Sequence, residues 1–232
     1  MMIKHYLKVA FRNLAKYKVQ SIVSILGLAV GFVCFALSTL WIRYEMTYDT
    51  FHEGAERIYL VRAHYAHEPG KISNSTPYPL ADYLQKGNPE IEAMASTSVQ
   101  KVKFRVKDTE KDVVSATADS VLMNFFNIRV LRGTVNFLKG TNGEIAITEE
   151  FSKRIFGEEE ALGREVEVSG HASKVGAIVS GWSSHSNIPY SILTSARHYT
   201  QWGSANENLF VRIRKGTNGE EFQKKIDCSP YQ

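Results

Sequence analysis

The stretch SIVSILGLAVGFVCFALSTLWI, from Ser21 to Ile42, contains no charged residue. As an α-helix these residues would extend about 33 Å, at about 1.5 Å per residue, which matches a hydrocarbon core of roughly 30 Å. Within lipid every backbone N–H and C=O group must be paired inside the segment. The sequence therefore predicts one membrane-spanning helix over residues 21–42.

The charges on the two sides of this run differ in sign. The preceding segment has no acidic residue and contains five basic ones: Lys4, Lys8, Arg12, Lys16 and Lys18. The following segment, despite Arg43 and Arg57, is dominated by four acidic ones: Glu45, Asp49, Glu53 and Glu56. Since lysine and arginine close to a span stay in the cytoplasm, we expect a cytoplasmic N-terminus and an outer location for residues after about 43.

Two other interpretations of the run fit less well. A cleaved signal peptide has an apolar region of only about 7–15 residues and a small-residue cleavage site, and neither feature is present. Cys34 suggests lipoprotein processing, but the bulky Val33 beside it fits poorly. An uncleaved anchor is the preferred interpretation, with Cys34 as a small apolar residue of the membrane helix.

Residues 1–20 are predicted to form an amphipathic helix. An apolar stripe with i, i+3, i+4 spacing runs beside a basic stripe that repeats every four residues from Lys4 to Lys16. Such a helix can lie in the headgroup plane, with membrane lipid as its partner. A docking surface for a cytoplasmic protein is the alternative.

Composition limits the remaining possibilities. The net charge is +4, and the first twenty residues contribute +5, so the rest of the chain stands at −1. A nucleic-acid partner is therefore not supported. Cys34 and Cys228 are the only cysteines, one in the span and one near the far end, so no disulfide framework is expected. Residues 43–232 must fold as an extracytoplasmic domain on an apolar core alone.

Many short strands with a few helices indicate an α+β fold for this domain. Alternating and β-branched residues predict strands at 58–63, 95–106, 111–118, 128–131, 144–148, 164–168, 173–179 and 209–214, with a hairpin turn at Asp108-Thr109-Glu110. Turn residues and amphipathic spacing predict helices at 80–86, 120–126, 149–156 and 220–226, the third of these capped by Thr148 and ended by Gly157.

The residues that could carry chemistry do not form a convincing site. No phosphate-cradling loop of the form GxxxxGK[ST] is present. His64 and His67 would face opposite sides of a strand, which argues against a metal site. The cluster Ser183-Ser184-His185-Ser186 lacks a third, orienting group, and Glu158-Glu159-Glu160 fits a solvated turn. We expect no catalytic, cofactor-binding or metal-binding residues and no enzyme activity; an anchored hydrolase using Ser184 and His185 is the disfavoured alternative.

Several stretches together resemble the MacB/FtsX-type ABC transporter permeases. After a basic amphipathic start and one span come Tyr48-Asp49-Thr50-Phe51-His52 and Ala55-Glu56-Arg57-Ile58-Tyr59-Leu60-Val61. The strongest similarity lies at Ile147-Thr148-Glu149-Glu150-Phe151-Ser152-Lys153-Arg154-Ile155-Phe156-Gly157, followed by Leu162-Gly163-Arg164. The order and spacing of these stretches cover nearly the whole chain.

This resemblance implies a permease subunit of the inner membrane, with one span followed by a periplasmic core domain of two subdomains and then by further spans. It also implies a cytoplasmic ABC ATPase on a separate chain, a homo- or heterodimer of permeases, and a role in export or mechanotransmission without cofactors. The chain has no second apolar run before Gln232, from which we expect a truncated member with an incomplete domain. The alternative is a single-pass anchored binding or sensor domain.

Overall fold

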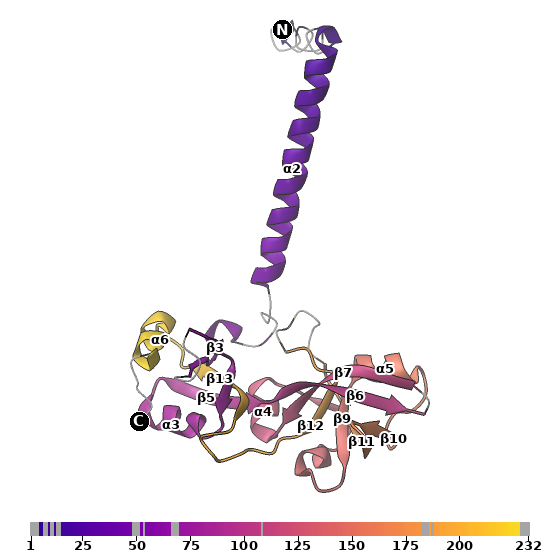
Figure 1. Ribbon diagram of the computed structural model, residues 1–232, viewed down its shortest axis with the longest axis vertical. Helices are drawn as coiled ribbons and strands as arrows, with labels where there is room; N and C mark the ends of the chain where they lie inside the picture. Colours follow the sequence, from indigo (N-terminus) through magenta and orange to yellow (C-terminus); the bar gives the residue numbers. More distant parts are fainter. Residues whose placement is uncertain are drawn as a thin grey trace. The chain divides into compact units, whose positions relative to one another are not determined.

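The computed structural model describes residues 5–6, 9, 12, 15–47, 52, 54–65, 70–107, 109–181, 186 and 188–227. The chain divides into two compact units, Met1–Tyr48 and Asp49–Gln232 (Figure 1). The first contains the helix α2 (Lys18–Met46), and the second contains every described strand. The second unit is called the folded domain below.

Helix α2 contains the predicted span and extends beyond it at both ends. None of its residues is buried, and large apolar side chains such as Leu28 and Phe32 are 77% and 69% exposed. It is the one described helix that is long and apolar enough to cross a membrane. A helix whose apolar side chains are exposed suits a lipid environment, because lipid would cover those side chains. The amphipathic helix expected over 1–20 stays a prediction, since Lys4 and Lys8 lie outside the described residues.

The folded domain contains thirteen described strands and several short helices. The strands are β1 (Ile58–Leu60), β2 (Ala63–His64), β3 (Ile72–Ser73), β4 (Ser75–Pro77), β5 (Ile91–Thr97), β6 (Val99–Val106), β7 (Thr109–Ala118), β8 (Val130–Gly133), β9 (Glu144–Thr148), β10 (Glu165–Val168), β11 (His171–Val179), β12 (Ile192–Ser195) and β13 (Ala205–Ile213). The helices are η1 (Ala55–Arg57), α3 (Leu80–Gly87), α4 (Ser120–Phe125), η2 (Val135–Lys139), α5 (Glu149–Phe156) and α6 (Gly219–Asp227).

Six of the strands close into a barrel in the order β10-β6-β7-β12-β9-β11, because β10 pairs with both β6 and β11. The pairings of β12 with β7 and of β11 with β9 are parallel, and the others around the barrel are antiparallel. Strand β8 adds to β11 outside the ring. The barrel is filled by apolar side chains, among them Phe104, Ile147, Val175 and Ile192, none more than 1% exposed. It is therefore a packed core, as expected for a small barrel.

A second sheet pairs β13 with β1 and β4, and also with β5. Helix α3 packs its buried Leu80 and Leu84 in one cluster with Leu209 and Val211 of β13 and with Phe222 of α6. A further cluster joins this sheet to the barrel through Phe210 of β13, Phe125 of α4, the adjacent Phe126 and barrel residues such as Ala116 and Ala146. The two sheets therefore share one of the three apolar clusters, and Figure 1 shows α4 between them.

Some details of the predicted secondary structure are wrong, among them the strand expected over 58–63, which is split into β1 and β2. The single strand expected over 95–106 is two strands, β5 and β6, which belong to different sheets. The strand expected to begin at 111, after a turn at 108–110, already begins at Thr109 as β7. The merging of β5 and β6 into one predicted strand has a clear cause: a period-2 pattern marks an extended backbone but does not show which partner it pairs with.

Candidate functional site

A polar cluster lies where the four-stranded sheet meets the barrel. The ring of His198 has its Nδ1 3.3 Å from Glu207 Oε1 and its Nε2 3.2 Å from Asp119 Oδ2. Tyr78 stacks on this ring, with centroids 4.0 Å apart and planes 14° from parallel. Asp119 follows β7 of the barrel, whereas Glu207 lies on β13 of the other sheet. We call these four residues the His198 junction, because the imidazole bridges the two sheets.

Local sequence explains how the two carboxylates are held. Asp119 is the N-cap of α4, where its Oδ1 accepts a hydrogen bond of 2.7 Å from the Leu122 N–H. Glu207 alternates in phase with the buried Leu209, Val211 and Ile213 of β13, so its side chain points inward and is only 3% exposed. A buried carboxylate requires a cationic partner, and His198 is the one placed to serve.

The electrostatics favour an imidazolium. Hydrogen bonds to Asp119 and to Glu207, reinforced by their charges and opposed by burial, raise the pKa of His198 to about 9. Burial alone would favour the neutral acid at Asp119, but hydrogen bonds from His198 and from the Leu122 N–H outweigh it and lower the pKa of that carboxyl. At neutral pH the junction is therefore a charged bridge.

The arrangement of the junction is structural. Both ring nitrogens of His198 face carboxylates, so neither is available as a general base. Among the described residues no group of three His, Cys, Asp or Glu residues is arranged to hold a metal ion. The junction can hold the two sheets together, and the strength of this link depends on the proton that makes His198 an imidazolium.

A second polar contact fixes the start of the folded domain. Arg57, the last residue of η1, points its Nη1 at Glu92 Oε2 of β5, 2.6 Å away, and donates to the Ile213 carbonyl at the end of β13, 2.8 Å away. Its side chain is only 17% exposed. We call this contact the Arg57 anchor. It ties the segment that follows α2 in the sequence to both long strands of the four-stranded sheet.

The last described helix lies beside the first strand. A Cβ atom added at Gly219, where α6 begins, would lie 2.2 Å from the hydroxyl of Tyr59 in β1. Near the other end of α6, Lys225 Nζ lies 2.7 Å from Glu90 Oε1, just before β5. The beginning and the end of the described domain therefore meet on one sheet.

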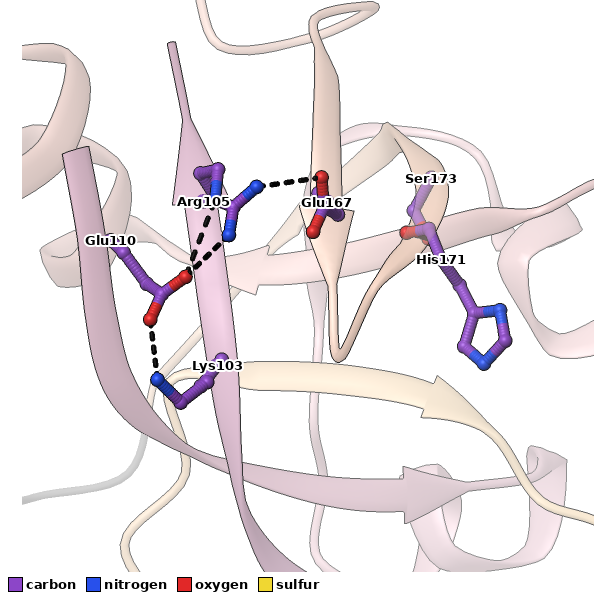
Figure 2. A network of polar contacts seen from close by, with 6 residues as sticks. All are labelled: Lys103, Arg105, Glu110, Glu167, His171 and Ser173. Carbon is purple, nitrogen blue, oxygen red and sulfur yellow. Dashed lines mark hydrogen bonds and ion pairs between the residues drawn. The ribbon is translucent and has the colours of Figure 1, made fainter. Parts of the chain in front are cut away.

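A third network crosses the seam of the barrel, and Figure 2 shows it. Arg105 of β6 lies 2.7 Å from Glu110 of β7 and 3.4 Å from Glu167 of β10, and Lys103 lies 2.5 Å from Glu110. Only two residue pairs join β10 to β6, so the Arg105–Glu167 pair supplements a short seam. The side chains are exposed, and their contribution to stability is correspondingly small.

The residues considered from sequence as possible sites do not come together. Glu159 and Glu160 form ion pairs with Arg164 and Arg132 at the surface. His64 lies in β2 with an exposed side chain, and His67 lies outside the described residues, as do Ser183, Ser184 and His185. The hydroxyl of Ser186 accepts a hydrogen bond from the Ile188 N–H. The absence of catalytic, cofactor and metal sites stays a prediction.

Sequence reasoning missed the His198 junction entirely. Its members, Tyr78, Asp119, His198 and Glu207, are far apart in the chain, and no motif links them. One signal was available: Glu207 occupies the buried phase of the strand that continues through Leu209, Val211 and Ile213. An acidic residue in that phase predicts a buried cationic partner, although it does not identify it.

One family of known proteins matches most of the chain. Residues 21–227 match the family described as the MacB-like periplasmic core domain. Among curated proteins, no sequence matches the chain.

Three solved structures share the fold at low sequence identity. A domain assigned to a permease of Porphyromonas gingivalis is 18% identical, with a TM-score of 0.62 over 75% of this chain and 83% of that one. The extracellular domain of the noncanonic ABC-type transporter YknZ from Gram-positive bacteria is 14% identical, with a TM-score of 0.51 over 72% and 86%. The periplasmic region of MacB from Actinobacillus actinomycetemcomitans is 12% identical, with a TM-score of 0.51 over 73% and 79%.

Proposed function

The chain belongs to the family of MacB-like periplasmic core domains, and on that premise we propose that it is a non-catalytic permease subunit of an ABC-type export or mechanotransmission system. In this role α2 spans the inner membrane with its N-terminus in the cytoplasm, and the folded domain lies in the periplasm. A separate cytoplasmic ATPase supplies the energy, and a second permease chain completes a dimer.

The Arg57 anchor is the observation that carries this proposal. Only residues 47–54 separate α2 from η1 in the sequence. Because Arg57 binds both Glu92 and the Ile213 carbonyl, a pull on this short connection would reach β5 and β13 together. A mechanical transmitter needs an attachment of this kind between its span and its sheet.

In the proposed mechanism the four-stranded sheet and the barrel act as two subdomains. The four-stranded sheet would receive the movement, and the barrel would follow it through α4 and the His198 junction.

Orientation can be tested by thiol labelling of the full chain. In a Cys34→Ser, Cys228→Ser background, Lys4→Cys should resist a membrane-impermeant reagent in intact cells, while the exposed Lys139→Cys should react. The reverse pattern would contradict the proposed topology.

Coupling can be tested with the same Lys139→Cys chain in permeabilised cells. Addition of ATP and vanadate should change the labelling rate of this cysteine, and Arg57→Gln should reduce that change. A labelling rate that is unaffected by nucleotide would contradict the proposed function and favour an anchored binding or sensor domain.

A further inference from the structure

The barrel has a hollow at the end where the β6–β7 hairpin meets α5. Its volume is about 330 Å³, within the range of sites that bind small molecules. The lining residues come from the hairpin, from α5 and from the segment before β10: Phe104, Val106, Lys107, Thr109, Lys111, Arg154, Ile155, Phe156, Glu159 and Arg164. We call this hollow the barrel mouth.

The floor of the barrel mouth is apolar and rigid. Phe104 is 1% exposed and packs edge to face on Phe151, with ring centroids 5.0 Å apart. Val106, Ile155 and Phe156 are half-buried around it. These side chains offer an apolar surface to whatever occupies the hollow, and the aromatic pair holds that surface in place.

The rim of the barrel mouth is strongly basic. Four cations line it, from Lys107, Lys111, Arg154 and Arg164, against the one carboxylate of Glu159. That carboxylate is already occupied, because Glu159 Oε2 lies 2.7 Å from Arg164 Nη2. Lys107, Lys111 and Arg154 form no ion pair with any described residue. Among the described residues, three positive charges are therefore left around an apolar floor.

Two of these charges, those of Lys111 and Arg154, are directed to the hollow by strand pairing and by packing. Lys111 is the cross-strand partner of Phe104, so the two side chains leave the same face of the hairpin. The guanidinium of Arg154 lies over the ring of Phe151, 5.2 Å from its centroid, which orients the group without neutralising its charge.

The opposite face of the same hairpin provides a contrast. There Lys103 and Arg105 are both matched by Glu110, and Arg105 also by Glu167 (Figure 2). Charge is thus balanced on the outer face and unbalanced at the barrel mouth. A concave site lined by one sign of charge with low-dielectric walls attracts ligands of the opposite charge.

We propose that the barrel mouth binds a small amphiphilic anion, with a carboxylate or phosphate group between Lys111 and Arg154 and an aromatic or short acyl body against Phe104 and Phe156. This binding site is additional to the proposed permease role and does not depend on it, since it requires neither the ATPase nor a second chain.

The probe for the test is 4-fluorophenyl phosphate, which combines a dianion with an aromatic body and stays in water. The full chain is placed in nanodiscs of zwitterionic lipid, and ¹⁹F NMR line broadening is followed against empty nanodiscs. Saturable binding is expected. The chain should bind the probe at least about tenfold more tightly than inorganic phosphate, which is used as a competitor. The same difference is expected against neutral 4-fluorobenzyl alcohol.

The double variant Lys111→Gln, Arg154→Gln should weaken probe binding by roughly tenfold or more. Both side chains lie at the domain surface, so folding should be retained, and thermal unfolding verifies this. The matched control is Lys101→Gln, Lys215→Gln, which removes two exposed charges elsewhere and should leave the affinity unchanged. Equal affinities in the two double variants, or probe binding no tighter than that of inorganic phosphate, would overturn the proposal.

Discussion

The ring of Tyr78 lies flat against the imidazole of His198, with centroids 4.0 Å apart. An aromatic face is electron-rich and therefore favours a cationic partner. Burial, followed by the nearby carboxylates, raises the pKa of the Tyr78 phenol, so the ring stays neutral while His198 is charged. The stack and the two carboxylates thus stabilise the same protonation state of His198.

The first prediction concerns stability against pH. The pKa of His198 is about 9 in the folded chain against an ordinary 6.5, so protonation favours the folded state. This contribution is fully present below pH 6.5 and is lost as the pH rises through 9. A shift of this size corresponds to a free energy of at most about 3 kcal/mol, because solvent reaches part of the junction and screens its charges. Denaturant unfolding of the full chain at pH 6 and at pH 10 measures it.

A control separates His198 from other titrating groups. In His198→Gln the fall in unfolding free energy between pH 6.5 and 9 should largely disappear. An unchanged pH dependence in this variant would show that another group is responsible.

The second prediction concerns the pair His198 and Glu207. His198→Gln leaves a buried carboxylate without a cation, and such a change typically costs about 3–5 kcal/mol. Glu207→Gln removes that uncompensated charge. The double variant His198→Gln, Glu207→Gln should therefore recover part of the stability that His198→Gln alone loses. A double-mutant cycle of unfolding free energies measures the coupling, and strictly additive effects would contradict the bridge.

Much of the local structure could be predicted from the sequence. The strand at 144–148 and the helix at 149–156 are confirmed with their bounds, and the hydroxyl of Thr148 caps that helix by accepting from the Phe151 N–H at 3.2 Å. These features depend on residues within a few positions of one another. Local propensity and capping chemistry therefore suffice to predict them.

The pairing of strands could not be predicted in this way. The barrel depends on β10 reaching both β6 and β11, and on parallel contacts of β12 with β7. Strands β6 and β10 are far apart in the chain, as are β7 and β12, whereas β10 and β11 are neighbours. The alternating residues of these strands would suit several partners equally well. The His198 junction eluded prediction for the same reason, since it forms only after the two sheets have met.

The third prediction concerns Gly133, which has φ +89° in β8. A Cβ atom there would lie 2.3 Å from the carbonyl oxygen of Gly176 and 2.8 Å from the Cα of Ala177. Because both are backbone atoms of β11, the strands would have to separate. Gly133→Ala should therefore destabilise the domain by more than the roughly 1–2 kcal/mol expected for the left-handed conformation alone.

Gly170 is the matched control for Gly133. It has a similar φ of +83°, but a Cβ atom there would have no neighbour within 4 Å. Gly170→Ala should therefore show only the conformational cost. Equal losses of unfolding free energy in the two variants would contradict the close approach of β8 to β11.

The fourth prediction uses two arginines as controls for one another. Arg57→Gln removes the cation that faces Glu92 and the donor to the Ile213 carbonyl, so β1 and the end of β13 should open more readily. Arg105→Gln removes the ion pairs across the barrel seam, so β6 and β10 should open instead.

Hydrogen exchange of the full chain in nanodiscs should show a roughly tenfold faster exchange at 58–60 and 211–213 in the first variant, since a partly buried hydrogen bond to a charged group is lost. The second variant should show a smaller acceleration at 104–105 and 167–168, because that network is exposed to solvent. Faster exchange in both regions from either variant would mean that the two sheets open as one unit, which would contradict a movement received by one sheet and passed to the other.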